Sequence, residues 1–282
     1  MTEQNWSEEI TPKNSLFDLD LRAVWKFRDL LLMFVKRDFV SVYKQSILGP
    51  LWFFIQPIFT TIVYVFVFGN LAGISTDSLP KTLFYMSGTV CWGYFSDCLT
   101  TISKVFETNK AIFGKVYFPR LIAPLSVVIS KLFKLGIQIL LFLAFLVYYM
   151  VFTEYNLHFS GYILLFPYLL LLMGILGLGL GLLITSMTNK YKDFNFLLQF
   201  GVQLLMYTTT VIYPLRGIDE EYRFWVKLNP MTSIIETFRY ATMGQGDFSW
   251  SGILYSSVFA LIVMVFGVLV FNRTQKSFMD TV

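Results

Sequence analysis

The chain has 282 residues, of which 56% are hydrophobic and 14% charged, and its formal net charge is +4. Soluble domains carry roughly 25% charged residues, so this composition excludes an ordinary water-soluble protein. We therefore expect lipid to be the solvent of this fold, and we expect no nucleic-acid partner. In lipid, only helices and closed barrels satisfy all of their backbone polar groups.

An amphipathic helix is predicted over residues 20–37, after an acidic opening that has no signal-peptide character and is expected to be retained in water. Asp18 or Asp20 can cap its start. Such a helix suits the headgroup layer of a membrane, and it can also receive a cytoplasmic partner. At 100° per residue, one face holds Val24, Phe27, Leu31, Phe34 and Val35, and the other holds Arg22, Lys26, Asp29, Lys36 and Arg37.

Six long apolar runs follow, and they define the fold class. Most approach the ~20 residues that a helix needs to cross a bilayer core. They are too long and continuous for barrel strands of about ten alternating residues. The prediction is an all-α, polytopic membrane protein with six spans at residues 48–71, 83–103, 135–152, 162–187, 194–213 and 253–272.

The distribution of basic residues favours one orientation of these spans. The segments on the side of the N-terminus hold fourteen Lys and Arg, whereas those on the other side hold five. Because cytoplasmic loops carry the excess of Lys and Arg, both termini are expected in the cytoplasm. The first set comprises residues 22–47, 104–120, 188–193 and 272–282, and the second comprises 72–82, 153–161 and 215–249.

Packing is the default explanation for the paired glycines and the two cysteines inside the spans. Gly177 and Gly181 form a G-x-x-x-G step, which lets helix backbones approach closely. Cys91 and Cys98 are separated by about 10 Å along one helix, too far for a disulfide. Asp97 is a functional candidate as an intramembrane carboxylate, but its place near the cytoplasmic end equally favours pairing with Lys or water.

A ladder of polar residues, one at every fourth position, marks a single helix face of the fifth run. Polar side chains are costly in lipid, so this face is expected to point into protein or water. Hydrogen bonding between helices and the lining of a transport path both remain open. With two aromatic residues of the first run, the candidates for a path are Trp52, Tyr64, Asn195, Gln199, Gln203 and Tyr207.

Two segments between the spans are unlike solvated loops. Residues 104–120, KVFETNKAIFGKVYFPR, mix cations with aromatic rings that either dip into the membrane interface or dock on a protein. Residues 215–246 predict two short helices, with Asp219 and Asn229 as caps and Gly244 as the stop. We expect these helices to form a hairpin that re-enters the membrane from outside, under a cover of protein or a water-filled cavity. Glu236 and Arg239 are three residues apart and can pair across a turn.

No enzyme chemistry is expected from this chain. It has no G-x-x-x-x-G-K-[ST] phosphate loop, no H-E-x-x-H and no G-x-S-x-G, and His158 lies in a loop without nearby Cys. We therefore expect no catalytic residue, no metal site and no cofactor on this chain.

With these features the chain resembles the membrane subunit of type-2 ABC exporters of lipid-linked polysaccharides, the O-antigen, capsule and teichoic-acid exporters. The strings that carry the resemblance are NKAIFGKVYFPRLIAPL and LNPMTSIIETFRYATMG. The resemblance implies a permease in the bacterial cytoplasmic (inner) membrane, built from two copies of this chain and two copies of a cytoplasmic ATPase that holds ATP and Mg. Its cargo would be an undecaprenyl-linked or similar lipid-linked glycan.

The resemblance also implies roles by position. Residues 1–47 would form a cytoplasmic region with an interface helix, 48–272 the transmembrane domain, and 273–282 a cytoplasmic tail. Within the domain, 104–120 would be the ATPase-coupling loop and 215–246 the outer gate. The interface-helix residues are Arg22, Trp25, Lys26, Phe27, Lys36 and Arg37; the coupling residues are Glu107, Asn109, Lys110, Phe113, Lys115, Phe118, Pro119 and Arg120; the gate residues are Tyr213, Pro214, Asn229, Pro230, Glu236 and Arg239.

Export of O-antigen or capsule is the preferred function, and teichoic-acid export by the same family is the runner-up. A secondary transporter would need coupling carboxylates and inverted repeats, and the sequence offers one intramembrane carboxylate and no repeat. A membrane-embedded glycan enzyme would need paired acids or a nucleophile with its base, and the sequence shows neither.

Overall fold

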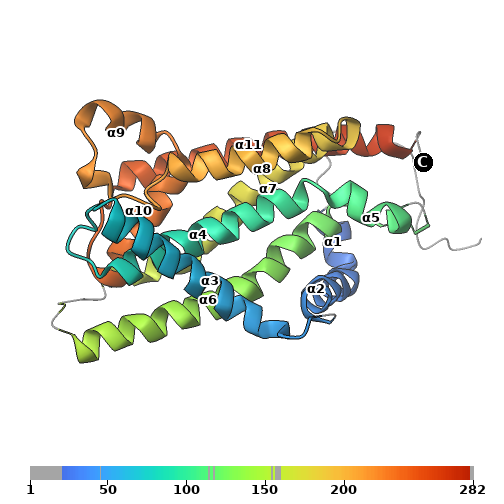
Figure 1. The fold of residues 1–282 in the computed structure, drawn as a ribbon. Coiled ribbons are helices and arrows are strands. Elements are labelled where there is room, and N and C mark those ends of the chain that lie inside the picture. The colour runs from blue at the N-terminus through green and yellow to red at the C-terminus, as the bar shows by residue number, and fades with distance from the viewer. Residues whose placement is uncertain are drawn as a thin grey trace, which may run out of the picture.

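Every regular element in the described part of the chain is a helix, which confirms the all-α class (Figure 1). The computed structural model describes residues 21–44, 46–113, 115, 116, 118–153, 155 and 160–279, with the backbone alone at 21–23, 42, 43, 189, 190 and 276–279. The proposed caps Asp18 and Asp20, the side chain of Arg22, and His158 lie outside the described residues. The longer helices are α3 (Trp52–Tyr64), α4 (Lys81–Ile102), α6 (Ile122–Phe152), α7 (Phe166–Lys190), α8 (Phe194–Tyr207) and α11 (Trp250–Met279).

Shorter elements gather at the two ends of this helical bundle. Figure 1 shows α1, α2 and α5 at one end, near the last turns of α11, and α9 and α10 at the other. We call these the α5 end and the hairpin end. The short α-helices are α1 (Leu21–Lys26), α2 (Arg28–Tyr43), α5 (Val105–Phe113), α9 (Glu220–Lys227) and α10 (Pro230–Met243); single turns are η1 (Gly49–Leu51), η3 (Gly161–Leu165) and η4 (Leu215–Gly217).

Four helices in the described residues are long and apolar enough to cross a membrane: Gly49–Leu71, Ile122–Phe152, Gly161–Thr188 and Trp250–Gln275. They correspond to the first, third, fourth and sixth predicted spans. The second, α4, has 22 residues but is interrupted by polar side chains such as Ser87 and Asp97. The fifth, α8, has only 14 residues and unwinds after Tyr207.

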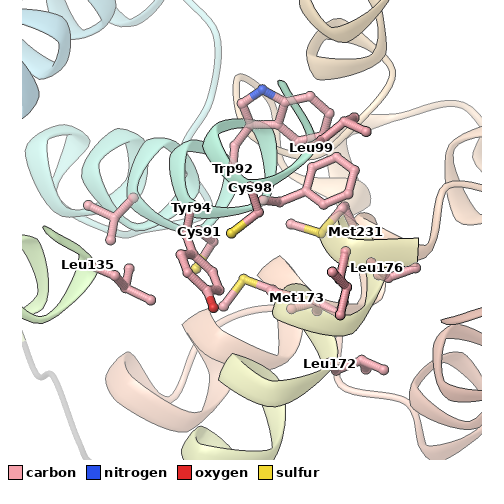
Figure 2. Close-up of a cluster of buried hydrophobic side chains, with 14 of the residues drawn as sticks. Cys91, Trp92, Tyr94, Cys98, Leu99, Leu135, Leu172, Met173, Leu176 and Met231 are labelled. Atoms are coloured by element: carbon pink, nitrogen blue, oxygen red, sulfur yellow. The ribbon is translucent and has the colours of Figure 1, made fainter. Parts of the chain in front are cut away.

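The position of α4 explains its polar content. It packs against α7, α6, α3 and α10, and most of its side chains are buried. Figure 2 shows Cys91, Tyr94 and Cys98 of α4 facing Met173 and Leu176 of α7. Because helices of the same chain surround α4, its polar side chains find protein neighbours. Both cysteines are free and buried, as their packing role predicts.

The glycines of α7 allow two close helix contacts. A Cβ on Gly177 would lie 2.7 Å from Cys98 Cβ, and one on Gly181 would lie 2.7 Å from Ile102 Cβ, which confirms the G-x-x-x-G packing against α4. On the other side of α7, a Cβ on Gly267 of α11 would lie 2.5 Å from the carbonyl oxygen of Gly179. Small residues thus set the spacing of the α4, α7 and α11 backbones.

Gly267→Ala should therefore destabilise the protein by about 1–3 kcal/mol, because the new methyl group meets backbone that cannot yield without separating α7 from α11. Gly136→Ala is the matched control, since a Cβ on Gly136 of α6 would have no neighbour within 4 Å. Thermal unfolding in detergent should show a lower Tm for the first variant only. Equal Tm values would contradict the close α7–α11 contact.

The C-terminal part of the first predicted span has an irregularity that the sequence did not predict. Residues Val65–Leu71 (η2) form a π-helix that continues α3. Lys81 Nζ donates to the carbonyl oxygen of Gly69 at 2.7 Å and to Asn70 Oδ1 at 2.8 Å. The lysine cation therefore caps the negative end of this helix and ties it to the start of α4.

Candidate functional site

The predicted coupling loop contains one short helix, α5, with a buried face and an exposed face. Asn109, Phe113, Phe118 and Arg120 are buried, whereas the exposed set is Glu107, Lys110 and Lys115, and Pro119 is intermediate. On the same short helix, Phe106 stacks on Phe271 of α11 with ring centroids 4.9 Å apart. The helix α6 begins soon after this loop, so neighbouring helices cover one side of the loop. We therefore correct one expectation: the rings of Phe113 and Phe118 fill a socket within this chain and offer no surface to a partner.

An aromatic cluster holds the segment after α5 in place. Phe118 packs edge-on against Phe34 of α2, with ring centroids 5.6 Å apart, and in a tilted arrangement against Phe113, also at 5.6 Å. Arg120 lies over the Phe113 ring at 5.4 Å and donates to the carbonyl oxygen of Gln275 at 3.0 Å. Burial lowers the pKa of the Arg120 guanidinium. These contacts join the loop to both α2 and the C-terminal part of α11.

The predicted N-terminal helix is interrupted. It forms two helices, α1 and α2, which meet at Phe27, and α2 continues to Tyr43 instead of ending near residue 37. Its apolar face is confirmed, since Phe34 and Val35 are buried. Trp25, Lys26 and Lys36 are exposed, and Phe27 is intermediate.

Arg37 was predicted to lie on the charged face of the N-terminal helix, but it contacts α5. Its Nη1 donates to Asn109 Oδ1 of α5 at 2.9 Å, and its guanidinium lies 4.3 Å over the Phe34 ring. One residue of the predicted interface helix and one residue of the predicted coupling loop therefore contact each other. Their 72-residue separation in the chain explains why local patterns could not predict the pair.

The candidate path residues lie on α3 and α8. Trp52, Gln199, Gln203 and Tyr207 are exposed on this chain. Tyr64 is intermediate, and its hydroxyl donates to Met206 Sδ at 3.5 Å, which joins α3 to α8. Among the described atoms, Asn195 Oδ1 is buried without a hydrogen-bond partner. Gln199, Gln203 and Tyr207 thus face away from the helices of their own chain whereas Asn195 is partly covered by them, and both interpretations of the ladder stay open.

At the hairpin end, the predicted helix boundaries are mostly confirmed. Asn229 Oδ1 accepts from the Met231 amide at 3.1 Å, Pro230 opens α10, and Gly244 ends it in the left-handed region at φ 70°. Asp219 occupies the cap position of α9, but its side chain makes no capping hydrogen bond. Tyr213 is intermediate and Pro214 is buried in the segment that enters the hairpin.

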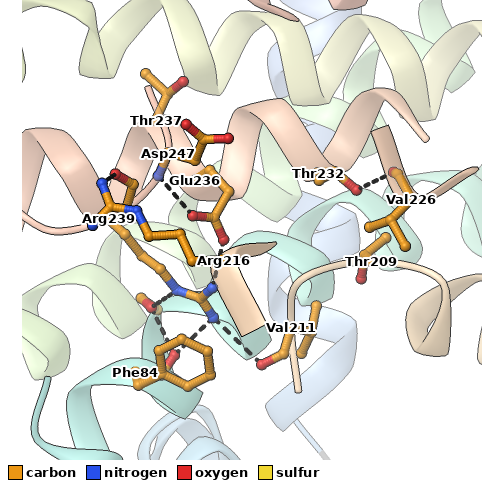
Figure 3. A network of polar contacts seen from close by, with 12 residues as sticks. Phe84, Thr209, Val211, Arg216, Val226, Thr232, Glu236, Thr237, Arg239 and Asp247 are labelled. Carbon is orange, nitrogen blue, oxygen red and sulfur yellow. Dashed lines mark hydrogen bonds and ion pairs between the residues drawn. The ribbon is translucent and has the colours of Figure 1, made fainter. Parts of the chain in front are cut away.

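The centre of the hairpin end is a polar network around Arg239, shown in Figure 3. The predicted pair with Glu236 is confirmed, with Arg239 Nη1 2.9 Å from Glu236 Oε1. The guanidinium also donates to Ser87 Oγ at 3.1 Å and to the carbonyl oxygens of Phe84 at 3.1 Å and Val211 at 3.4 Å. It lies 3.7 Å over the Phe84 ring. One side chain thus joins α10 to α4 and to the unwound end of α8.

Glu236 extends the Arg239 network to the α10–α11 connection. Its Oε2 accepts from the Asp247 amide at 2.9 Å, and Asp247 pairs with Lys227 of α9 at 3.3 Å. Glu236 and Arg239 are only 3% and 1% exposed, so their mutual neutralisation is what makes burial tolerable. Glu236 and Asp247 also line a pocket of roughly 250 Å³ between α9, α10 and the start of α11.

The carboxylate inside the second predicted span has a partner. Asp97 of α4 pairs with Lys134 of α6 at 2.8 Å, and both side chains are partly exposed. This confirms the pairing interpretation over a lone intramembrane acid.

The fold and these sites define a class: a helical integral membrane protein with polar networks at both ends. Residues 29–243 match the family described as ABC-2 type transporter, so the chain belongs to that family.

Several relatives match most of the chain. It is 25% identical over 253 residues to the O-antigen export system permease protein RfbA of Klebsiella pneumoniae, covering 89% of this chain and 94% of the relative. The protein of the same name from Myxococcus xanthus is 26% identical over 224 residues, covering 78% and 82%. The polysialic acid transport protein KpsM of Escherichia coli is 20% identical over 246 residues, covering 87% and 93%.

Proposed function

We propose that this chain is the permease subunit of an ATP-driven exporter that moves a lipid-linked polysaccharide, of O-antigen or capsule type, across the bacterial inner membrane. The observation that carries the proposal is the family match over residues 29–243 together with relatives named for O-antigen export and polysialic acid transport. Teichoic-acid export by the same architecture is the second candidate.

In this proposal α4 and α8 complete a six-span domain over residues 48–272, with both termini in the cytoplasm. The burial of α4 among other helices supports counting it as a crossing despite its polar residues. The α5 end would face the cytoplasm and the hairpin end the outside, where α9 and α10 would re-enter the membrane as a gate. The location of α1, α2 and the end of α11 at one end of the bundle supports this orientation (Figure 1).

Two kinds of protein partner would complete the exporter complex. A cytoplasmic ATPase, present in two copies and holding ATP and Mg, would dock on the exposed face of α5, which carries Glu107 and Lys110, and on Lys115 just after this helix. A second copy of this chain would cover the exposed face of α8, where apolar residues such as Phe196 and Phe200 accompany the polar ladder. The glycan would pass between the two copies, and it would need no cofactor on this chain.

A complementation experiment tests the function. The gene, expressed with its cognate ATPase, is placed in a strain that lacks its own O-antigen or capsule permease, and surface glycan is measured by antibody binding to intact cells. We expect surface glycan to return only when both genes are present. If lipid-linked glycan stays inside in several such hosts, while both proteins are present in the membrane, the export function is wrong.

A further inference from the structure

We propose that Arg37 is a positioning residue that makes α2 and α5 move as one body, so that a displacement delivered to α5 also reaches α2 and α6. The proposal rests on the proposed function, in which the ATPase docks on the exposed face of α5. It concerns how the movement is passed on inside this chain.

The acceptor of the link is fixed rigidly on α5. Asn109 is 3% exposed, and both halves of its amide are used. Its Nδ2 donates to the carbonyl oxygen of Val105, one turn earlier, at 2.9 Å, and its Oδ1 accepts from Arg37 Nη1 at 2.9 Å. The amide therefore cannot rotate without losing one bond, so any movement of α5 carries the acceptor with it.

The donor is held on α2 by an ion pair and a ring contact. The Nε and Nη2 atoms of Arg37 both donate to Asp38 Oδ1, at 2.9 and 2.7 Å, and its guanidinium stacks on the Phe34 ring. The other carboxylate oxygen of Asp38 lies 3.2 Å from Ser126 Oγ on α6, whose single hydroxyl proton is shared with the carbonyl oxygen of Ala123 at 2.8 Å. A chain of directional contacts thus runs from α5 through Arg37 and Asp38 to α6.

A second contact between α2 and the segment that follows α5 is of another kind. The Phe34 and Phe118 rings meet edge-on, and apolar rings of this sort can slide with little change in contact. Charge-assisted hydrogen bonds are directional and stronger than neutral ones. Arg37 is therefore the side chain suited to transmit a displacement, while the rings keep the two helices close.

The first test measures the coupling of the two helices directly. Spin labels are placed on cysteines introduced at Ser41 of α2 and Thr108 of α5, both exposed, while the native cysteines stay buried. In the purified permease, Arg37→Ala should broaden the label-to-label distance distribution, and Asn109→Ala should do the same. The double variant should be no broader than either, because the two changes remove one interaction.

The control and the rescue use matched changes. Lys44→Ala removes a cation from an exposed position at the end of α2 and should leave the distribution as in the unchanged protein. Asn109→Asp keeps an oxygen acceptor for Arg37. Its distance distribution should therefore be nearly as narrow as that of the unchanged protein, unlike that of Asn109→Ala. A distribution that Arg37→Ala leaves unchanged overturns the proposal, and this arm needs no ATPase.

The second test measures function in the complex with the ATPase. We expect Arg37→Ala to keep ATPase assembly and basal hydrolysis, and to lower the stimulation of hydrolysis by lipid-linked glycan about fivefold. A merely structural defect would lower assembly as well. If glycan fails to stimulate the unchanged complex, the proposed function is wrong; if it stimulates the unchanged complex and Arg37→Ala equally, the role of Arg37 is wrong.

Discussion

Arg239→Ala should destabilise the protein by about 3–5 kcal/mol. The change leaves the buried Glu236 carboxylate without its counter-charge and removes the donor from Ser87 and from the carbonyl oxygens of Phe84 and Val211. A buried acceptor that loses its donor keeps the full cost of desolvation. Thermal and denaturant unfolding in detergent, followed by tryptophan fluorescence, measure the loss.

Arg216→Ala provides the matched control at the same end. Arg216 is exposed and donates to the carbonyl oxygen of Gly246 at 3.2 Å, so its removal should cost less than about 1 kcal/mol. The charge swap Glu236→Arg with Arg239→Glu should not restore stability, because the relocated cation loses the partners on α4 and α8. Similar unfolding of Arg239→Ala and Arg216→Ala would show that the Arg239 network does not hold the hairpin end together.

Lys110→Glu should weaken assembly with the ATPase about tenfold or more while leaving the permease itself stable. Lys110 is exposed on α5, and reversing its charge at an interface replaces attraction by repulsion, which costs several kcal/mol where the patches are complementary. Co-purification at fixed salt, followed by titration with the ATPase, measures the effect.

Two further variants separate docking from folding. Arg216→Glu makes the same change in net charge at the hairpin end and should assemble normally. Phe113→Asp buries a carboxylate among aromatic rings and should lower the Tm of the permease alone. Normal assembly by Lys110→Glu, with the fold intact, would remove α5 from the docking surface.

Local sequence signals predicted the local parts of this structure. Asn229, Pro230 and Gly244 each act within a few residues of where they stand, so the boundaries of α10 follow from the sequence. The i, i+3 spacing likewise predicted that Glu236 pairs with Arg239. Asp219 shows the limit of such signals, because a suitable residue at a cap position need not make the capping bond.

The contacts that join distant segments were not predictable from one sequence. The partners of Arg239 come from α4 and from the end of α8, 28 to 155 residues away, and the Arg37–Asn109 bond spans 72 residues. The buried face of the loop over residues 104–120 also depends on contacts with distant segments. The sequence alone could therefore not divide this loop into buried and exposed faces. The apolar run over residues 83–103 predicted a helix there, but it could not predict that α4 is buried among the other helices of the chain.

Reconstitution of the purified permease in liposomes, with and without its cognate ATPase, tests the central claim most directly. We expect no ATP hydrolysis by the permease alone, because the sequence contains no phosphate-binding loop. With the ATPase bound, lipid-linked O-antigen or capsule glycan should stimulate hydrolysis, and the glycan should cross the bilayer only when ATP is supplied. Glycan transport that proceeds equally well without the ATPase, or robust hydrolysis by the permease alone, would contradict the account.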